Sequence, residues 1–479
     1  MEQFMKINTA VNGFVWGPVM LVLLVGTGIY LSIAVGFIQF TKIGYWWKNT
    51  IGKIFKKGEA GDGEITPLQA VSTALASTVG TGNIAGVTGA IILGGPGAVF
   101  WMWVSALFGM VTKFSEVTLA VKYRERNEKG DWCGGPMYYI KNGLGPKWKW
   151  LGGVFAVLGA IAAFGIGNIA QVHSIADSVK SVAVAFNENA ASRETMICLI
   201  TGICVAIFVA LVLLGGVKRI GQVTEKLVPG MAVIYIVCAL IVVFANVSAV
   251  PGVFASIFKG AFNPAAVTGG AAGMSIKLAM TKGVGRGVFS NEAGLGSAPI
   301  AHAATSERNP VKQGLYGIFE VFMDTIVICT ITSLTVLCSG VWTQEGLSSG
   351  QLALAAFQSV FGSFGAIFVA VTVFLFVFST IISAGFFGQI QAEILFGRKF
   401  SKIWVFMYPL FIGIACAFSN VTTMYMITDG FMAIIVILNM IGLLLMCKQV
   451  KDLQKEYYNT PGMYYLADKA AKEAKKAAK

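Results

Sequence analysis

Residues 77–86 of the chain read S-T-V-G-T-G-N-I-A-G. They lie inside a segment, residues 75–93, that is otherwise apolar and long enough to cross a bilayer. In hydrocarbon every backbone N–H and C=O group needs a hydrogen-bond partner, and glycine lowers the cost of leaving helical dihedral angles. The three glycines Gly80, Gly82 and Gly86 therefore predict that this membrane helix is broken near its middle.

Such a break would offer two kinds of polar backbone group. The N–H groups at the start of the second half-helix carry partial positive charge and can hold a carboxylate, while the carbonyls that end the first half suit an ammonium or a sodium ion. Close helix packing is the alternative, because Gly82 and Gly86 also form a small-xxx-small pair. The four polar side chains at residues 77–83 favour binding, since packing does not require them at mid-membrane.

The composition is that of a polytopic membrane protein. The chain has 479 residues, of which 56% are hydrophobic and only 12% charged, and its mean hydropathy is +0.73. Apolar runs of membrane-spanning length recur from one end to the other. We predict eleven spans, at residues 14–40, 68–93, 97–121, 150–179, 195–214, 227–247, 252–280, 311–339, 363–392, 403–418 and 421–447.

The basic residues predict the orientation. Of the 36 lysines and arginines, 29 lie in the C-terminal tail or in loops after odd-numbered spans, and only three lie in the other loops and the N-terminus. Positive charge stays on the cytoplasmic side. We therefore expect a multi-pass protein of the plasma membrane with its N-terminus outside and its C-terminus inside. This bias also accounts for the net charge of +13, which gives no reason to expect nucleic-acid binding.

A second apolar segment is also interrupted. Within residues 252–280, Thr268–Ser275 reads T-G-G-A-A-G-M-S. Paired interruptions in the two halves of a chain indicate an inverted-repeat transporter and mark its binding site. The two interrupted spans are the second and the seventh, so two five-helix repeats are predicted, in an all-α fold. The predicted divisions are an extra N-terminal helix with its basic loop (1–67), a first repeat (68–248), a second repeat (249–447) and a basic tail (448–479).

Two stretches resemble known families. V-G-T-G-N in the second span resembles the break in the first core helix of the neurotransmitter:sodium symporter-like fold. G-V-G-R-G-V-F-S-N-E-A-G-L-G-S-A-P, at Gly283–Pro299, resembles the signature of the alanine or glycine:cation symporter family, in the amino acid–polyamine–cation superfamily. The resemblance covers about residues 15–450. It implies import of small neutral amino acids, alanine and glycine, with sodium as the coupling ion, by a monomer in the lipid bilayer.

The resemblance also implies which residues bind substrate. The carboxylate would meet the N–H groups of Thr81 and Gly82, and the ammonium would meet the carbonyl of Thr78 and carbonyls of the second interruption. A polar side chain of the fourth span, Gln171 or else Asn168, would close the carboxylate side. The implied site is Thr78, Gly80, Thr81, Gly82, Asn83, Phe164, Asn168, Gln171, Gly269, Gly270, Gly273, Met274, Ser275 and Phe376, in which Phe164, Met274 and Phe376 are the bulky walls.

The implied sodium site lies between the second and the ninth span. Its ligands would be the hydroxyls of Ser379 and Thr380 and the backbone carbonyls of Ala76, Val79 and Phe376. Sodium is a hard cation that takes oxygen ligands, so this set suits it. From the residues alone, the alternative is that both hydroxyls donate to carbonyls one turn earlier in their own helix.

Two pairs of charged residues lie close together within predicted spans. Lys113 and Glu116 are one helical turn apart, which predicts an internal ion pair, with a proton relay as the alternative. Glu320 and Asp324 are four residues apart on one helix face, where like charges repel. Either one of them is protonated, or both face water, or a partner lies nearby; a coupling-ion or gating role is the functional alternative.

The signature segment itself predicts a hinge. We interpret Gly283–Gly287, with Asn291 and Glu292, as a cytoplasmic gate in which Arg286 and Glu292 form an ion pair. The segment lacks the G-x-x-x-x-G-K-[ST] pattern of a phosphate-binding loop. The sequence shows no nucleophile–base pair, metal cluster or nucleotide motif, so we do not expect an enzyme.

Two rival functions remain open at this stage. Proton coupling could run through Glu320, Asp324 or His173, although His173 is better explained as a packed polar residue. A channel is less favoured, because a channel needs a continuous polar lining, whereas the polar residues here gather at two interruptions.

Overall fold

The computed structural model describes residues 17, 19–53, 60–61, 63–186, 193–263, 276–344, 346–415 and 421–464. Over these ranges the chain is almost entirely helical, and its one sheet is the antiparallel pair β1 (Glu125–Arg126) and β2 (Trp132–Cys133). Seven of the described helices are long and apolar enough to cross a membrane, or eight if one bent pair is a single span. The chain is thus an all-α membrane protein, as its composition predicts.

The helices up to the middle of the chain are α2 (Met20–Ala34), α3 (Ile38–Thr41), α4 (Ile43–Asn49), η2 (Ile51–Lys53), α5 (Pro67–Thr78), η3 (Gly82–Gly86), α6 (Val87–Gly94), α7 (Gly97–Lys122), α8 (Pro136–Gly143), η4 (Pro146–Trp148), α9 (Lys149–Phe164), η5 (Gly165–Ile169), α10 (Ala170–Phe186), α11 (Glu194–Leu213) and α12 (Gly216–Ala245). The later helices are η7 (Val247–Ala249), α13 (Val250–Phe262), α14 (Ile276–Asn291), α15 (Ala298–Ala303), α16 (Pro310–Val321), η9 (Phe322–Cys329), α17 (Thr330–Cys338), η10 (Val341–Thr343), α18 (Ser349–Phe361), α19 (Ser363–Ala415) and α20 (Val421–Asn459).

The break predicted in the second span is present. Helix α5 begins with a capping box, in which Thr66 and Gln69 exchange backbone and side-chain hydrogen bonds, and it ends at Thr78. A turn of π-helix, Gly82–Gly86, then starts the second half. The two halves are bent by 53° relative to each other. The unwound backbone between them lies at Val79 and Gly80, and Thr81 already has helical dihedral angles.

A second interruption lies between α14 and α15. Glu292 (φ 54°), Gly294 (φ 95°) and Gly296 (φ 78°) all adopt the left-handed region there. Glycine reaches this region without strain, whereas glutamate seldom does. The interruption that we predicted from the sequence, Thr268–Ser275, lies outside the described residues.

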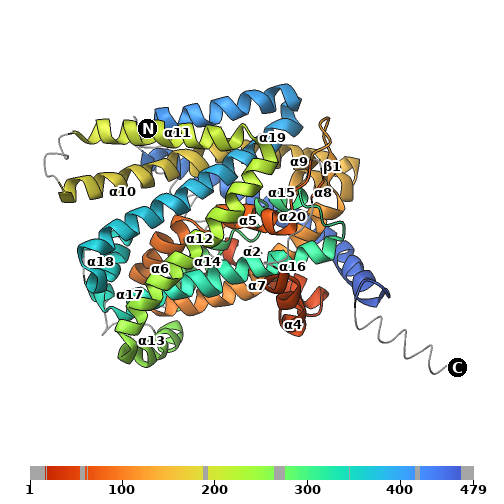
Figure 1. Cartoon of the computed structure of the whole chain (residues 1–479). Helices are drawn as coiled ribbons and strands as arrows, with labels where there is room; N and C mark the ends of the chain where they lie inside the picture. Colours follow the sequence, from red (N-terminus) through yellow and green to blue (C-terminus); the bar gives the residue numbers. More distant parts are fainter. Residues whose placement is uncertain are drawn as a thin grey trace.

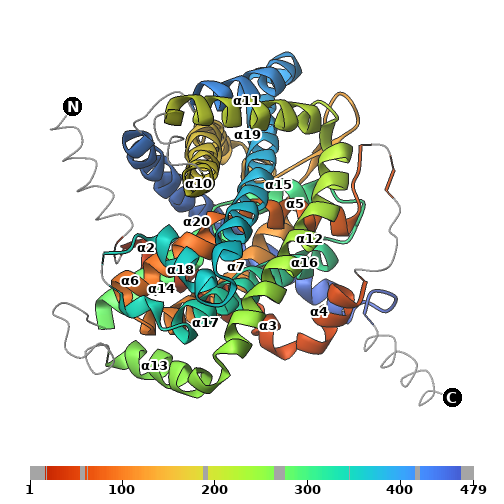
Figure 2. The ribbon, with the colours of Figure 1, turned by 60° about the vertical axis from the view of Figure 1, so that its left-hand side comes forward.

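The helices form two groups with the breaks between them. Helix α7 packs against α14 and α16 in one group, and α19 packs against α9, α10 and α11 in the other (Figure 1). Helices α5 and α15 contact each other between the groups, and the turned view keeps this arrangement (Figure 2). The fold therefore places both interruptions at the interface between two helix groups.

Helix α19 covers two predicted spans. It runs from Ser363 to Ala415, but Gly397 has φ 75° and ψ 178°, so the chain turns there rather than continuing as one helix. Merged helices of this kind are one reason why the described long helices are fewer than the eleven predicted spans.

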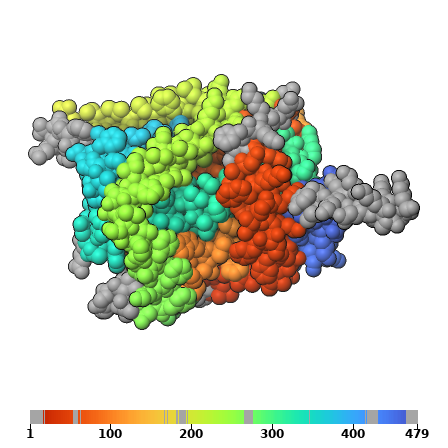
Figure 3. Space-filling model, turned by 60° about the horizontal axis from the view of Figure 1, so that its bottom comes forward, coloured from red at the N-terminus to blue at the C-terminus, as the bar shows by residue number. Residues whose placement is uncertain are grey.

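The outer surface carries the apolar side chains that lipid requires. Helix α12 exposes Val233, Ile234, Val237, Ile241 and Phe244, at helical spacing along one side. With α13 it crosses the face shown in Figure 3, beside the N-terminal helices in red.

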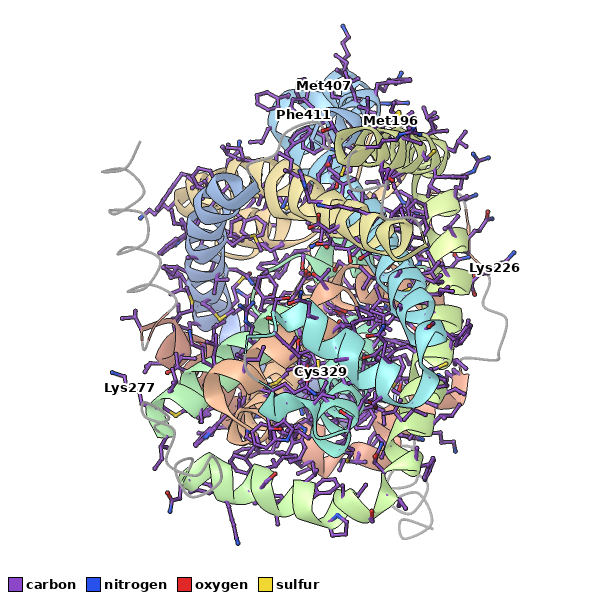
Figure 4. The ribbon with its side chains drawn as sticks, turned by 90° about the vertical axis from the view of Figure 1, so that its left-hand side faces the viewer. Met196, Lys226, Lys277, Cys329, Met407 and Phe411 are labelled. Carbon is purple, nitrogen blue, oxygen red and sulfur yellow. The ribbon has the colours of Figure 1, made fainter. Side chains whose placement is uncertain are left out.

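Figure 4 labels residues at the outer edge and in the interior of the molecule. Met196, Met407 and Phe411 lie at its outer edge (Figure 4). Cys329, in contrast, is almost fully buried.

One loop cluster ties three distant segments together. The Glu64 carboxylate accepts hydrogen bonds from Arg126 and Arg308, both at 2.7 Å, and from the Trp132 indole at 3.0 Å. Burial raises the pKa of Glu64, but the Trp132 hydrogen bond and the charges of Arg308 and Arg126 outweigh it and hold the pKa below its ordinary value. The cluster lies directly before α5 and so anchors the start of the broken helix.

Candidate substrate and cation site

A cavity of about 120 Å³ opens at the first break. Its wall is built from the end of α5 and the unwound residues, from α9 and α10, from the second interruption, and from α19 and α20. Six residues of the predicted sites lie on this wall: Thr78, Gly80, Thr81, Gly82, Gln171 and Thr380. The structure therefore brings the break, the fourth predicted span and the ninth together around one space.

Asn83 points away from this cavity. Its side-chain oxygen accepts a hydrogen bond from the backbone N–H of Gly80 at 2.8 Å, and its amide nitrogen donates to the Asp324 carboxylate at 2.7 Å. The side chain is fully buried. Asn83 thus satisfies one of the backbone groups that the break sets free, which is what a membrane interior demands.

Asn168 and Phe164 also serve packing in this structure. Asn168 donates to the carbonyl of Tyr408 at 3.0 Å. The Phe164 ring lies 4.5 Å from Trp404 and 4.9 Å from Phe411, measured between ring centroids. Neither side chain is on the cavity wall.

Phe376 is buried against Tyr235, at 5.4 Å between centroids, and is likewise off the cavity wall. The large apolar residues that do line the cavity are Phe155, Phe289, Leu295, Phe387, Met432 and Ile435. The predicted contacts Gly269, Gly270, Gly273, Met274 and Ser275 lie outside the described residues.

Two glutamines carry unpartnered oxygens on the cavity wall. The side-chain oxygens of Gln171 and Gln391 have no hydrogen-bond partner, and the two residues are 7% and 5% exposed. A buried polar atom without a partner is costly and marks a place where a ligand can bind.

The predicted cation ligands lie together beside the cavity. The Ser379 hydroxyl lies 3.2 Å from the Ala76 carbonyl of α5 and 2.8 Å from the Phe376 carbonyl. The Thr380 hydroxyl donates to the Phe376 carbonyl at 3.0 Å. Hydrogen bonds from these hydroxyls to the Phe376 carbonyl, within their own helix, are the alternative that the sequence left open. The contact between Ser379 and Ala76, in contrast, joins two different helices. Val79 directly follows α5 at the same place.

Thr380 connects the two sites. It lines the cavity, and a Cβ placed on Gly80 would meet its hydroxyl oxygen at 2.9 Å. Only glycine at position 80 lets the unwound backbone come this close to α19. The oxygen cluster and the break are therefore direct neighbours.

The second interruption contributes residues that sequence reasoning interpreted only as a gate. Glu292, Leu295 and Ser297 line the same cavity. The Glu292 carboxylate accepts hydrogen bonds from Ser77, at 3.0 Å, and from Ser297. The signal was present in the sequence, because the stretch S-N-E-A-G-L-G-S holds two glycines and interrupts a helix just as V-G-T-G-N does.

The predicted ion pair between Lys113 and Glu116 is wrong. Lys113 instead pairs with Glu320 at 3.2 Å, and His302 lies 3.2 Å from the same carboxylate. Glu116 bonds to the second interruption instead: its carboxylate accepts a hydrogen bond from the backbone N–H of Gly296 at 3.1 Å. The sequence could not show this, since the partner of each charge comes from a distant segment.

Asn439 completes this contact at the second interruption. Its amide nitrogen donates to the Glu116 carboxylate at 2.6 Å and to the carbonyl of Gly294 at 2.8 Å. A buried carboxylate and a buried amide thus hold the unwound backbone from two helices.

Glu320 and Asp324 avoid mutual repulsion by having separate partners. Those of Glu320 are Lys113 and His302, whereas Asp324 accepts hydrogen bonds from Asn83, Ser290 and Thr325. The sequence left open protonation, exposure to water or a nearby partner. The structure shows a nearby partner for Glu320.

Two further predictions can be compared with the structure. Arg286 and Glu292 do not pair: the Arg286 guanidinium lies 5.7 Å from the centre of the Phe289 ring, and Glu292 is bonded to serines. Six residues along a helix place two side chains on different sides, so the pair could not form across α14. His173 is a packed polar residue as predicted, with Nε2 at 2.9 Å from the Ala415 carbonyl.

A larger cavity of about 740 Å³ lies on the other side of the break. It shares Thr81, Gly82 and Phe289 with the smaller cavity and includes Asp177 and Arg286. The residues of the first break and one aromatic ring therefore separate two spaces, which is the arrangement that alternating access requires.

A helical membrane fold with a broken helix between two cavities defines a secondary transporter. The family model described as the sodium:alanine symporter family matches residues 1–467. The chain belongs to this family, and it is a multi-pass transporter of the amino acid–cation symporter type.

Among its relatives, the uncharacterized transporter YflA of Bacillus subtilis is 43% identical, over 98% of this chain and 96% of that protein. The sodium/alanine symporter AgcS of Methanococcus maripaludis is 42% identical, over 95% of this chain and 97% of that protein. The probable sodium/glutamine symporter GlnT of Bacillus subtilis is 37% identical, over 93% of this chain and 89% of that protein.

Solved structures show the same fold at low identity. The crystal structure of MhsT in complex with L-phenylalanine superposes with a TM-score of 0.57 and 16% identity, covering 79% of this chain and 88% of that one. A manganese transporter of Eremococcus coleocola superposes with a TM-score of 0.50 and 14% identity, covering 82% of this chain and 79% of that one.

Proposed function

We propose that this chain is a sodium-coupled symporter that imports small neutral amino acids, alanine and glycine, by alternating access. The observation that carries the proposal is the position of Thr380, which belongs to the oxygen cluster with Ser379 and Phe376 and also lines the cavity against Gly80. A sodium ion held there would order the unwound backbone that receives the substrate.

Coupling follows from this contact. If sodium fixes the break in its binding geometry, sodium raises the affinity for the amino acid, and the amino acid raises the affinity for sodium by the same factor. The hydroxyls of Ser379 and Thr380 and the carbonyls of Ala76, Val79 and Phe376 would then bind the ion. The N–H groups at Thr81 and Gly82 would bind the carboxylate of the substrate, with Gln171 beside them.

The proposed substrates are small because bulky side chains wall the cavity. Phe155, Phe289, Phe387 and Met432 lie on its wall and, in this proposal, leave room for a side chain no larger than a methyl or hydroxymethyl group. Hydrophobic pockets separate one methylene by only about 1–3 kcal/mol, so alanine, glycine and serine should all bind.

We further propose an architecture of eleven spans. It has an extra N-terminal helix (1–67), inverted repeats at 68–248 and 249–447, and a basic tail (448–479). The charge bias supports an outer N-terminus and a cytoplasmic C-terminus in the plasma membrane. Rocking of the α7–α14–α16 group against the group around α19 would alternate access, and one monomer would suffice.

Uptake of radiolabelled alanine into proteoliposomes tests the function, with sodium, lithium or protons as the only gradient. Concentrative uptake that requires sodium is expected. Uptake driven by a pH gradient without sodium would favour proton coupling instead. Flux that neither saturates nor accumulates substrate would favour a channel.

A further inference from the structure

Glu292 is a carboxylate held in a fixed position on the wall of the smaller cavity, the one of about 120 Å³ at the first break. It is the first residue of the second interruption, and its backbone adopts φ 54°, a region that a glutamate seldom occupies. Ser77 and Ser297 both donate to the same carboxylate oxygen, Oε2. The surrounding structure thus holds the side chain in one orientation at the cost of backbone strain.

The other oxygen of this carboxylate is not used. Oε1 of Glu292 accepts no hydrogen bond from the described part of the chain, and no lysine or arginine there forms an ion pair with it. The charges that act on Glu292 are those of Lys113 and Glu320, and these two pair with each other at 3.2 Å. A carboxylate in a membrane interior is costly when it is charged, and a cation that enters the cavity would stabilise its charged form.

The rest of the cavity wall has the same character. Gln171 and Gln391 line this space, both are more than nine-tenths buried, and their side-chain oxygens have no hydrogen-bond partner in the described part of the chain. The cavity therefore combines one positioned carboxylate oxygen with amide acceptors. Thr81 and Gly82 of the first break line the same cavity.

Two kinds of cation could meet these acceptors. Sodium requires a shell of several oxygens around one point, and the cluster of Ser379, Thr380 and nearby carbonyls offers that elsewhere. A primary ammonium carries three N–H donors and needs only one acceptor for each. A single free carboxylate oxygen beside uncharged amides suits the ammonium better.

We propose that Glu292 is the counter-ion of the substrate's α-ammonium group and sets the preference for amino acids over other small carboxylates. This inference rests on the proposed function and names the ammonium end of the same site. Ser77 and Ser297 act as positioning residues, because they fix Oε2 and leave Oε1 for the substrate. The carboxylate of the substrate then faces the N–H groups of the first break.

The test compares alanine with lactate, which carries a hydroxyl in place of the ammonium. Thermal-shift titration of the purified protein with saturating sodium gives a dissociation constant for each ligand. In Glu292→Gln the dissociation constant of alanine should rise at least about tenfold, because a charge-assisted hydrogen bond is lost. The constant for lactate should rise by a smaller factor, because its hydroxyl can donate one hydrogen bond to Glu292 but carries no positive charge to pair with the carboxylate. Glu128→Gln, at a side chain that is 79% exposed, is the matched control and should change neither constant.

Equal losses of affinity for alanine and lactate would mean that Glu292 only connects Ser77 to Ser297, and this would overturn the proposal. Unchanged affinity for both ligands would overturn it as well. If Glu292→Gln does not fold, Glu292→Asp is used in its place. This variant keeps the negative charge, so it should keep the preference for alanine over lactate. Loss of that preference would also overturn the proposal. Failure of the proposed function would appear in the wild-type protein, as absence of sodium-dependent alanine binding, and this inference would fail with it.

Discussion

The side-chain oxygen of Asn83 accepts a hydrogen bond from the backbone N–H of Gly80 at 2.8 Å, so the first break is held from within its own helix. The same side chain donates to Asp324 in η9 at 2.7 Å. A helix that unwinds in a membrane must find new partners for the freed backbone groups. Asn83 supplies one of them and connects the break to a buried carboxylate of the neighbouring helix group.

Asn83→Ala should therefore destabilise the protein and weaken substrate binding together. It leaves the Gly80 N–H without its partner, and a buried unsatisfied group costs about 1–3 kcal/mol. It also removes one of the two hydrogen bonds to Oδ1 of Asp324, which keeps the one from Ser290. A fall in the unfolding temperature and a higher dissociation constant for alanine are expected. Asn142→Ala, at an exposed asparagine, is the control and should change both by little. Wild-type alanine affinity in Asn83→Ala would show that the break does not depend on this bond.

Thr380→Ala should raise the sodium concentration for half-maximal alanine uptake. Loss of one oxygen ligand from the proposed five-oxygen site should cost about tenfold in ion affinity, on the scale of one hydrogen bond to a charged group. Ser379→Ala should act in the same direction, because its hydroxyl lies between the Ala76 and Phe376 carbonyls. Sodium titrations of uptake in proteoliposomes measure both effects.

Thr372→Ala is the matched control for these two variants. Thr372 is a buried threonine of the same helix, 4% exposed, and it does not line the smaller cavity at the first break. Its loss should leave the sodium requirement unchanged. An unchanged requirement in Thr380→Ala as well would contradict the assignment of the cation site.

Local sequence signals were enough to predict the first break. Gly80 and Gly82 interrupt an apolar run, and the structure bends there by 53°. The capping box at Thr66 and the left-handed glycines 294 and 296 are equally local. Signals of this kind depend on backbone preferences of a few residues, which the sequence states directly.

Contacts between distant segments could not be predicted in the same way. Lys113 and Glu116 satisfy the spacing of a helical ion pair, yet Glu320 is the partner of Lys113 because α16 packs along α7. Phe164 and Phe376 were expected on the cavity wall, but which side of a helix faces a cavity depends on its rotation against its neighbours. Periodicity fixes the faces of a helix and not their partners.

Lys113→Met should destabilise the protein strongly. Lys113 and Glu320 are both fully buried, and removing one member of a buried pair leaves the other charge unpaired, at about 3–5 kcal/mol. Lys113→Met combined with Glu320→Gln should recover part of the loss, because the remaining partner is then neutral. Unfolding temperatures of the single and double variants measure this.

The pair of Lys141 and Glu125 provides the comparison for a surface ion pair. Their side chains are 33% and 41% exposed and lie 3.0 Å apart. Lys141→Met should cost less than about 1 kcal/mol. If Lys113→Met proved as mild as Lys141→Met, the buried pair would not be a structural element of the α7–α16 contact.

Glu64→Gln should lower stability at neutral pH, and its effect should vanish in acid. The guanidinium groups of Arg126 and Arg308 lie 2.7 Å from the Glu64 carboxylate and stabilise its charged form. Because the pKa in the folded protein is below the ordinary value of 4.5, the contribution is fully present above that value and is lost as the pH falls through the folded-state pKa. Unfolding temperatures of wild type and variant should therefore differ at pH 7 and converge once the pH falls below the folded-state pKa. Glu128→Gln, in the same loop region but exposed, should follow the wild type throughout. A difference that grew on acidification would mean that Glu64 is protonated in the folded protein and that the arginines are held by other groups.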